Sequence, residues 1–567
     1  MEWKNRLYFG DNLDILRREV PDASVDLIYL DPPFNSNATY NVLFKEKSGE
    51  ESAAQIMAFE DTWQWSVEVE AVYKEIVTGG PRRLADLMQA LLAFLGRNDM
   101  MAYLVMMAIR LVELHRVLKP TGSIYLHCDP TASHYLKLVL DAIFGHGGFL
   151  NEVAWKRSSA HSDTKQGMKR CGRIHDVLFI YSKSENYTWH PTYTPYTKEY
   201  LESEYRHVAQ DGRRYKETDL TAAKPGGDVK YKWRVKRQMA KGRRWEADLT
   251  DEYVRPRKGF EYKAVSPYGG RFWAYSKQNL VEFARNGHLI HRSTGMPRLV
   301  QYADEMPGIP VQDLWSDISP AMGTEDLGYP TQKPSALLER IVYLSSNEGD
   351  LVLDPFCGCG TAIAAAEGLK RRWIGIDITY LAINLVQRRL RDSFGEQLSP
   401  YEIIGAPTDA QGAEALKEIS PHQFEWWAVD LVNARPAKGQ KKGADTGIDG
   451  YINFFDDKSG QAKQVIVQVK SGYIGVNHVR DLKGVLDREK AAIGALITLR
   501  EPTKPMLTEA AATGFYESKD FPGRYPRLQI LTIAELLAGK KLEYPAHRVE
   551  TFAKAERKTK IQQEGLF

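Results

Sequence analysis

The sequence predicts an α/β protein in which a long insert interrupts one sheet, and three observations support this fold class. Short apolar, strand-like segments alternate with helical segments from about residue 26 to residue 181. The alternation is lost between residues 184 and 328, where aromatic, basic and turn-forming residues are frequent, and it resumes at about residue 334. A second series of strands and helices follows residue 420. We therefore expect a main α/β domain with an insert and a smaller α/β domain after it.

The chain is too long for one hydrophobic core, because single cores stop growing at roughly 250–300 residues. Its 567 residues suit several domains. The predicted boundaries are 1–183 for the first part of the main domain, 184–328 for the insert, 329–400 for the second part of the main domain, 401–419 for a linker and 420–567 for the C-terminal domain.

In the first part of the main domain, the apolar segment 25–30 predicts a buried strand, and the amphipathic segment 98–118 predicts a helix. The methionines of this helix recur at helical spacing and are interrupted by charged residues such as Arg110, which indicates core packing. A strand at 123–127 and a helix at 133–144 follow.

The same alternation defines the later elements. In the second part of the main domain we expect a helix at 334–346, a strand at 351–354, a helix at 362–369, a strand at 373–377 and a helix at 381–391. In the C-terminal domain we expect a helix at 424–433, strands at 448–454 and 464–470, a helix at 476–490 and a strand at 493–499.

Composition and charge are those of an ordinary globular protein, with 43% hydrophobic residues, 26% charged residues and a net charge of +3. The charge is uneven, because residues 224–244 hold nine basic side chains against Asp228 alone, which favours contact with nucleic-acid phosphates. The N-terminus lacks the apolar run of a signal peptide, and no apolar run is long enough to cross a membrane, so we expect a cytoplasmic protein without membrane contact. The four cysteines form no CxxC pair, which argues against a disulfide framework or a zinc ribbon.

Two short segments follow predicted strands and carry complementary chemistry. They are Asp31-Pro32-Pro33-Phe34 and Asp354-Pro355-Phe356-Cys357-Gly358-Cys359-Gly360-Thr361. The glycines of the second segment let backbone N–H groups and a helix N-terminus approach a ligand, which suits the carboxylate of an amino-acid cofactor. One strand later, Asp377 stands where it can accept hydrogen bonds from ribose hydroxyls. A phosphate-binding loop is disfavoured, because GxGxxG and GK[ST] motifs are absent and Asp354 would repel phosphate.

The first segment suits an amino group as the acceptor of a methyl group. The amino group of adenine or cytosine is a poor nucleophile, because its lone pair is delocalised into the ring. Asp31 and the Pro32 carbonyl can accept both N–H bonds and localise that lone pair, while Phe34 stacks on the extruded base. Methylation of cytosine at carbon 5 would instead need a thiolate, usually from a Pro-Cys dipeptide, and no cysteine here follows a proline.

Two further segments make the pattern specific, Gly10-Asp11-Asn12 before the first segment and Thr331-Gln332-Lys333-Pro334 before the second. With them, the sequence resembles the beta-class DNA amino-methyltransferases over about residues 5 to 395. The resemblance implies a Rossmann-like, S-adenosylmethionine-dependent methyltransferase sheet with a target-recognition insert. It implies catalytic roles for Asp31, Pro32 and Phe34. The residues that it assigns to the cofactor are Asp11, Lys333, Asp354, Phe356, Gly358, Gly360, Thr361 and Asp377.

Within this resemblance, Asp11 would contact the adenine of the cofactor, Asp377 its ribose, and Lys333 would lie near its methionine end. The sequence departs from the family at Cys359, where serine is usual, and a thiol forms weaker hydrogen bonds. The Asp-Pro-Pro-Phe form favours adenine over cytosine as the target, and RNA stays open as an alternative substrate. The insert would read double-stranded DNA or, alternatively, form a solvated loop, and the analogy with relatives makes a homodimer a candidate assembly.

A second candidate site lies in the C-terminal domain. Asp449 lies at the start of one predicted strand and Lys470 ends the next, so a hairpin would bring them together. A carboxylate, a second oxygen ligand and a lysine suit a metal-dependent phosphodiesterase, in which the metal polarises the phosphate and the lysine orients water. Glu425, on the preceding helix, could supply a further carboxylate.

The wider sequence of this domain resembles the Mrr branch of the PD-(D/E)xK endonucleases over about residues 420 to 535. The segments that carry the resemblance are Phe424-Glu425, Lys442-Gly443-Ala444-Asp445, Gly447-Ile448-Asp449-Gly450 and Gln468-Val469-Lys470. It implies a smaller, restriction-endonuclease-like α/β fold with Asp449, Gln468 and Lys470 as catalytic residues and Asp449 and Glu425 as Mg2+ ligands. The sequence thus predicts a restriction-modification protein that methylates adenine in duplex DNA and cuts DNA; the alternative is an adenine or N4-cytosine methyltransferase whose C-terminal domain binds DNA or a partner without cutting.

Overall fold

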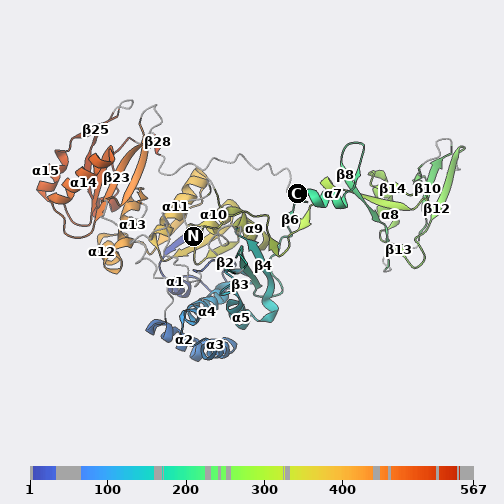
Figure 1. Cartoon of the computed structure of the whole chain (residues 1–567), viewed down its shortest axis with the longest axis horizontal. Helices are drawn as coiled ribbons and strands as arrows, with labels where there is room; N and C mark the ends of the chain where they lie inside the picture. Colours follow the sequence, from blue (N-terminus) through green and yellow to red (C-terminus); the bar gives the residue numbers. More distant parts are fainter. Residues whose placement is uncertain are drawn as a thin grey trace. The chain divides into compact units, whose positions relative to one another are not determined.

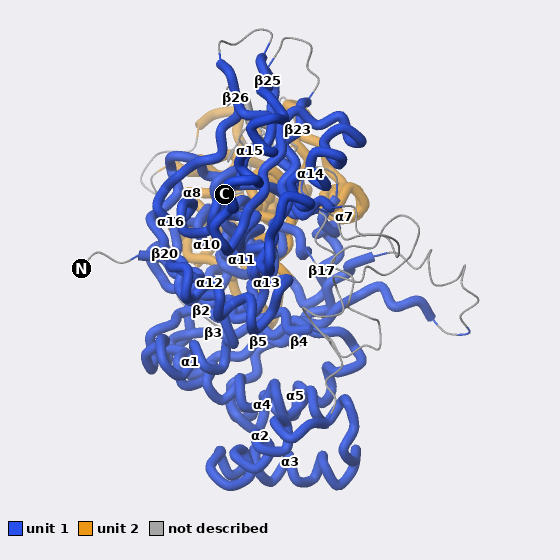
Figure 2. Tube along the Cα trace, turned by 90° about the vertical axis from the view of Figure 1, so that its left-hand side faces the viewer, with its two compact units in different colours: residues 1–190, 312–559 blue, residues 191–311, 560–567 orange. Residues whose placement is uncertain are grey.

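The structure is a computed structural model. It describes residues 4–33, 65–158, 169, 171–223, 231–239, 244–250, 257–322, 325, 332–437, 447–456, 462–518 and 523–545, and the backbone of 548–549. Two compact units are distinguished, one formed by residues 1–190 and 312–559 and the other by 191–311 and 560–567 (Figure 2). None of the described helices is both long and apolar enough to span a lipid bilayer.

The main domain is built on a nine-stranded sheet, which confirms the predicted α/β class (Figure 1). In spatial order its strands are β17 (Leu314–Trp315), β4 (Phe149–Lys156), β5 (His175–Ser182), β3 (Leu118–Cys128), β2 (Val25–Leu30), β18 (Leu351–Asp354), β19 (Arg372–Asp377), β1 (Asn5–Phe9) and β20 (Tyr401–Ile404). Strand β5 is antiparallel to both of its neighbours, and all other neighbouring strands are parallel. The central strands are apolar along most of their length, as expected for strands that are covered on both faces.

Helices pack around this sheet, and those after residue 98 lie at positions that the apolar periodicity predicted, whereas those before it were not predicted. They are α1 (Asn12–Glu19), α2 (Val67–Gly79), α3 (Arg82–Leu95), α4 (Asp99–Val117), α5 (Ser133–Phe144), α9 (Ser335–Ser345), α10 (Thr361–Gly368) and α11 (Tyr380–Phe394). Helix α4 begins after Asn98, whose side chain accepts a hydrogen bond from the Met101 amide and so caps the helix. Met101 and Met107 are fully buried, which confirms that the methionine-rich segment belongs to the core.

In its described residues the insert is a folded unit of small antiparallel sheets and short helices. Its elements are β6 (Tyr193–Thr194), α7 (Lys198–Glu204), β7 (His207–Val208), β8 (Arg214–Asp219), β9 (Thr221–Ala222), β10 (Trp233–Gln238), β11 (Glu246–Ala247), β12 (Phe260–Val265), β13 (Phe272–Trp273), α8 (Lys277–Arg285), β14 (Leu289–His291), β15 (Pro297–Tyr302) and β16 (Ile309–Pro310). Trp233, Trp245 and Trp273 form its core and are at most 6% exposed. These tryptophans therefore stabilise the insert and are not surface groups on which an extruded base could stack.

The basic run of the insert lies partly outside the described residues, which omit 224–230 and 240–243. In the described part, Arg234 Nη2 lies 2.6 Å from Oδ2 of Asp248, and Arg237 forms an ion pair with Glu261. Acidic partners thus neutralise part of the positive charge that the sequence pattern alone suggested.

The C-terminal domain contains a six-stranded mixed sheet. Its strands are β21 (Arg435–Pro436), β22 (Gly450–Phe455), β23 (Lys463–Lys470), β24 (Ile493–Thr498), β27 (Leu528–Thr532) and β28 (Arg548–Val549), with a separate β25 (Phe515–Glu517) and β26 (Arg524–Pro526) pair. Its helices are α12 (Ala410–Ile419), α13 (Pro421–Leu431), α14 (Val476–Glu489), α15 (Lys504–Ala511) and α16 (Ile533–Leu537). Residues 401–419, which were predicted to be a linker, are instead part of the folded structure. Strand β20 (Tyr401–Ile404) belongs to the main sheet, because it pairs in parallel with β1, and residues 410–419 form α12.

Candidate active site

Four carboxylates lie at the carboxyl ends of adjacent parallel strands. The order β2, β18, β19, β1 places Asp31, Asp354, Asp377 and Asp11 along one edge of the sheet, each at or just beyond the end of its strand. The register supports this, because Leu353 pairs with Ile28 and Asp377 pairs with Phe9. Ligands of parallel α/β sheets bind at this edge, where loops leave the strands.

The glycine-rich loop between β18 and α10 needs its glycines for two separate reasons. Gly358 and Gly360 have φ values of 48° and 75°, in the left-handed region that favours glycine. A Cβ atom at Gly360 would also lie 2.8 Å from Cγ2 of Val386 on α11. The next residue, Thr361, is buried and begins α10. The loop thus brings its backbone and a helix N-terminus to the sheet edge, as the sequence predicted.

Asp377 shapes this loop. Its Oδ2 accepts a hydrogen bond of 2.9 Å from the Gly358 amide, and its Oδ1 accepts hydrogen bonds of 2.8 Å from the amide and hydroxyl of Thr379. Burial nevertheless raises the pKa of the Asp377 carboxyl. The carboxylate is therefore tied to the loop that the sequence assigned to the cofactor.

Asp354 lies deeper than Asp377. Its Oδ1 accepts a hydrogen bond of 3.1 Å from the amide of Phe356, whose side chain packs against the main core. Burial raises the pKa of Asp354 well above its usual range, and the negative charges of Asp31 and Asp377 add to this effect. The ammonium group of Lys333 acts in the opposite direction and lowers the pKa of Asp354.

Asp31 and Lys333 are joined, although they are far apart in the sequence. Lys333 Nζ, just before α9, forms an ion pair with Oδ2 of Asp31. The Oδ1 atom of Asp31 is buried and has no hydrogen-bond partner among the described residues. Pro32 is buried beside it, whereas Phe34 lies outside the described residues. The sequence placed Lys333 at the cofactor, and the structure places its ammonium group on the carboxylate predicted to be catalytic.

Asp11 is held by residues that the sequence reasoning did not select. Its Oδ1 caps α1 by accepting from the Leu13 amide at 2.7 Å, and its Oδ2 accepts from Arg110 Nη2 at 2.9 Å. Arg110 Nε also donates to Asn12 Oδ1 at 2.6 Å, and Asn12 Nδ2 donates to the Pro355 carbonyl at 2.8 Å. This network ties the end of β1 to the glycine-rich loop. The sequence feature that could have indicated this network was a charged residue, Arg110, inside an otherwise apolar helix.

Cys359, the departure from the serine of the related family, is buried in the same loop. Its Sγ lies 3.7 Å from the hydroxyl of Thr361 and 3.5 Å from Nη2 of Arg389. Burial raises the pKa of the thiol, so it stays protonated and packs as a small uncharged group.

The structure brings together only some of the residues of the predicted second site. Asp449 follows the predicted hairpin geometry: its Oδ2 accepts a hydrogen bond of 2.7 Å from the Val469 amide, next to Lys470. Gln468 is buried, and its Oε1 has no hydrogen-bond partner among the described residues. Glu425 on α13 lies 3.3 Å from Nδ1 of His422. Within the described residues, no group of three or more histidine, cysteine, aspartate or glutamate side chains is arranged to hold a metal ion.

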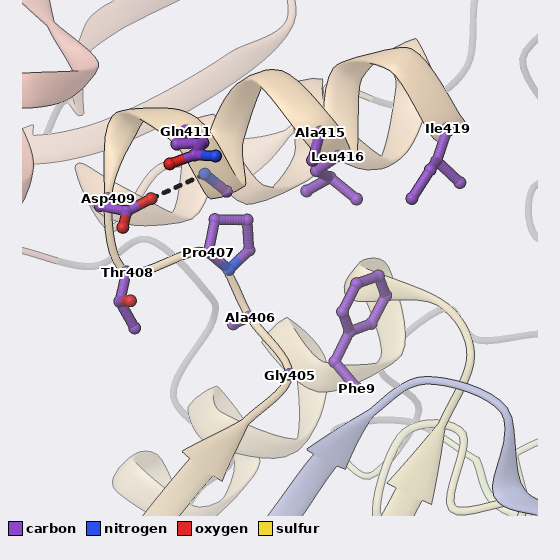
Figure 3. A pocket seen from close by; sticks show the side chains of 11 residues that line it. Phe9, Gly405, Ala406, Pro407, Thr408, Asp409, Gln411, Ala415, Leu416 and Ile419 are labelled. Atoms are coloured by element: carbon purple, nitrogen blue, oxygen red, sulfur yellow. Dashed lines mark hydrogen bonds between the residues drawn. The ribbon is translucent and has the colours of Figure 1, made fainter. Parts of the chain in front are cut away.

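A pocket of about 540 Å³ lies at the carboxyl ends of β1 and β20. Phe9 at the end of β1, the segment 405–409 and one side of α12 line it (Figure 3). Asp409 faces back to cap α12 and accepts a hydrogen bond of 2.7 Å from the Gly412 amide. None of the residues predicted for cofactor binding or catalysis lines this pocket, so the chemistry of the strand ends defines the candidate site.

The structure thus combines an α/β sheet with a glycine-rich loop and four carboxylates at the carboxyl ends of its parallel strands. A family model described as DNA methylase, of the N6 and N4 type, matches residues 25–388. The match covers more than half of the chain, and the protein belongs to this DNA methylase family. A second model, described as a NACHT-associated inactive restriction endonuclease, matches residues 421–538.

Similar proteins include a type II methyltransferase and a subunit of a type III restriction-modification enzyme. The chain is 31% identical over 290 residues to the type II methyltransferase M.EcaI of Enterobacter cloacae, covering 51% of this chain and 57% of that protein. It is 27% identical over 387 residues to the Mod subunit of the type III enzyme StyLTI of Salmonella typhimurium, covering 65% and 50%. The chain therefore spans about half the length of these relatives. The solved structure of the cytosine-N4-specific PvuII DNA methyltransferase is 14% identical and covers 68% of this chain and 86% of that chain, with a TM-score of 0.31.

Proposed function

We propose that this protein transfers a methyl group from S-adenosylmethionine to the N6 amino group of adenine in double-stranded DNA. The observation that carries the proposal is the buried Oδ1 of Asp31, which has no hydrogen-bond partner within the part of the chain that the structure describes and lies at the edge of the sheet beside the glycine-rich loop. A buried acceptor without a partner among the described residues is costly unless a ligand supplies the donor. An amino group of an extruded base is such a donor, and Asp31 would localise its lone pair toward the methyl group.

The cofactor proposal rests on the loop and on charge. S-adenosylmethionine supplies an activated methyl group, and its sulfonium and ammonium groups are cationic. Asp354 and Asp377 at the strand ends suit this charge, because a cationic ligand would offset the negative charge of Asp377, which contributes to the raised pKa of Asp354. Asp377 and the backbone of the glycine-rich loop would hold the nucleoside and the amino-acid portion, and Asp11 would contact the adenine.

The choice of adenine rests on the Asp-Pro-Pro-Phe form of the first segment, with N4-cytosine as the alternative. The names of the relatives M.EcaI and StyLTI Mod support a role in restriction and modification. By the same likeness, residues 1–183 and 329–400 would carry catalysis and cofactor binding, and the insert at 184–328 would recognise the DNA target.

Single-molecule sequencing of DNA from cells that express the protein tests this proposal, because it reports the modified base and its sequence context together. We expect N6-methyladenine at one short motif, absent from cells that carry an empty vector. N4-methylcytosine at a motif would overturn the choice of base. Modification of neither base would overturn the proposed activity, and methyl transfer to RNA in preference to duplex DNA in vitro would overturn the proposed substrate.

For the C-terminal domain we propose the non-cutting alternative. The predicted Mg2+-dependent cleavage lacks support, because the matching family model is described as inactive and Gln468 replaces the usual acidic residue. Replacement of a carboxylate by an amide lowers the negative charge available to a divalent cation. Glu425, the second predicted metal ligand, is paired with His422 in the structure. The domain would then contribute DNA or partner binding.

A plasmid-cleavage assay checks this prediction. We expect unmethylated supercoiled plasmid to stay intact with the purified protein in Mg2+ or Mn2+. The same result is expected for Asp449→Ala and Lys470→Ala, which serve as matched variants. Nicking or linearisation by the unaltered protein that both substitutions remove would instead show that the domain is an active nuclease.

A further inference from the structure

A side chain of the C-terminal domain completes the first turn of helix α11 in the main domain. The amide of Tyr380, the first residue of α11, donates a hydrogen bond of 2.7 Å to Oε1 of Gln423 on α13. The first N–H groups of a helix have no acceptor within that helix and need one from elsewhere. The contact is buried, because Gln423 is 8% exposed and Tyr380 is 4% exposed. Gln423 therefore supplies an acceptor that the N-terminus of α11 requires.

The turn that Gln423 holds is the one that contains Asp377. Thr379, the N-cap residue of α11, donates its amide and its hydroxyl to Oδ1 of Asp377, each at 2.8 Å. Oδ2 of Asp377 accepts a hydrogen bond of 2.9 Å from the Gly358 amide in the glycine-rich loop. Contacts between neighbouring groups thus lead from Gln423 through the start of α11 to the loop proposed to bind the cofactor.

Gln423 is itself held in place by the helix that carries it. It lies in the first turn of α13, where its amide donates to the hydroxyl of the N-cap residue Ser420 at 3.4 Å. On the same helix, Phe424 and Trp427 are at most 1% exposed and anchor α13 in the protein interior. An acceptor on an anchored helix has little conformational freedom left to lose, so Gln423 is well placed to hold the Tyr380 amide.

Other contacts join the two domains further along α11. Gln387 Nε2 donates to Oδ2 of Asp430 on α13 at 3.1 Å, and Arg391 Nη1 donates to Oδ1 of Asn433 at 2.7 Å. Gln387 lies about two helical turns beyond Tyr380. These contacts therefore fasten α11 to the C-terminal domain without touching the turn that contains Asp377.

Gln423 lies beyond the DNA methylase match at residues 25–388 and within the match at 421–538. On the basis of the proposed binding of S-adenosylmethionine, we infer that Gln423 is a positioning residue of the cofactor site. By holding the start of α11, it fixes the carboxylate of Asp377 and, through it, the glycine-rich loop. The affinity of the main domain for its cofactor thus depends on a side chain of the C-terminal domain.

The substitution Gln423→Leu tests this, because it keeps most of the side-chain volume and leaves the Tyr380 amide without its acceptor. We expect the dissociation constant of S-adenosylmethionine, measured by isothermal titration, to rise at least about fivefold, the lower end of typical couplings between two sites. Gln423→Asn, whose side chain is one methylene shorter, is a milder second variant that should also weaken binding.

A conservative variant and a matched control separate positioning from general stability. Gln423→Glu keeps an acceptor for the Tyr380 amide, and its charge suits the N-termini of both α11 and α13, so it should bind the cofactor as the unaltered protein does. Gln387→Leu removes a glutamine that is equally buried, at 8% exposed, from the same pair of helices. Its dissociation constant should stay within about twofold of the unaltered value, as expected for independent sites.

A second measurement needs neither cofactor nor DNA. Hydrogen–deuterium exchange reports local opening of the backbone. In Gln423→Leu, exchange should become faster at the amides of Gly358, Thr379 and Tyr380, because the turn that holds them is loosened. In Gln387→Leu, exchange at these three amides should match that of the unaltered protein.

Three results would overturn the inference. They are an unchanged affinity in Gln423→Leu, equal weakening in Gln423→Leu and Gln387→Leu, and a Gln423→Glu variant that binds as weakly as Gln423→Leu. If Gln423→Leu does not fold, Gln423→Asn is judged by the same criteria. Failure of the proposed function is distinguishable, because the unaltered protein would then not bind S-adenosylmethionine, while the exchange measurement would still show whether Gln423 holds the turn at Asp377.

Discussion

Replacement of Asp31 by alanine is expected to lower the rate of methyl transfer by about 100- to 10,000-fold, the range typical of a positioned proton-accepting group. Asp31 provides the buried acceptor oxygen without a partner among the described residues at the sheet edge. Without it, the lone pair of the target amino group would stay delocalised in the ring. Single-turnover transfer of a tritium-labelled methyl group to duplex DNA measures the effect.

Two further variants help to interpret the result expected for Asp31→Ala. Asp86→Ala removes a carboxylate on α3 whose side chain is 70% exposed, and it should methylate DNA at the unaltered rate. Asp31→Asn keeps the shape of the side chain and should be as slow as Asp31→Ala, because the amide carries no negative charge. Cofactor affinity should stay within about threefold in both Asp31 variants, since Asp31 accepts from the substrate in our proposal. Methyl transfer by Asp31→Ala at the unaltered rate would show that the catalytic assignment is wrong.

Replacement of Asp377 by alanine is expected to weaken the binding of S-adenosylmethionine by about 10- to 100-fold. A hydrogen bond to a charged group contributes roughly 1.5–3 kcal/mol, and each 1.4 kcal/mol is about a factor of ten in affinity. Asp377 also holds the Gly358 amide at 2.9 Å, so its loss loosens the loop that surrounds the cofactor. Isothermal titration with S-adenosylmethionine measures the dissociation constant.

The control for this prediction is Glu396→Ala, which removes an exposed carboxylate shortly after α11. Its dissociation constant should match that of the unaltered protein. Thermal unfolding of both variants separates a local loss of affinity from a global loss of stability. If Asp377→Ala bound the cofactor as tightly as the unaltered protein, the assignment of Asp377 to the ribose would be contradicted.

Much of the main domain was predictable, because its elements are long and strongly periodic. The helix expected at 98–118 is α4, Asp99–Val117, and the helix expected at 334–346 is α9, Ser335–Ser345. Parallel strands present their carboxyl ends at one edge, so acids that follow apolar strand-like segments can be grouped from the sequence pattern alone. Asp31, Asp354 and Asp377 follow this rule.

Other parts could not be predicted. The segment 401–419 contains a strand of four residues, β20, which is defined by its pairing with β1, far away in the sequence. The tryptophans of the insert look like surface aromatics in a polar, basic sequence, yet Trp233 and Trp273 are buried in its core. Short strands in antiparallel sheets acquire their burial pattern from cross-strand neighbours, which local sequence does not specify.

The sequence by itself determined the order of the two motifs, the α/β class and the carboxylates at the strand ends, because each depends on local pattern and on the polarity of parallel strands. Only the tertiary structure decided which side chains share a hydrogen bond. Lys333 pairs with Asp31, Arg110 holds Asp11, and a histidine lies between Tyr29 and Asp176. Such contacts join residues far apart in the chain, and their geometry depends on how helices and strands pack rather than on the spacing of residues along the sequence.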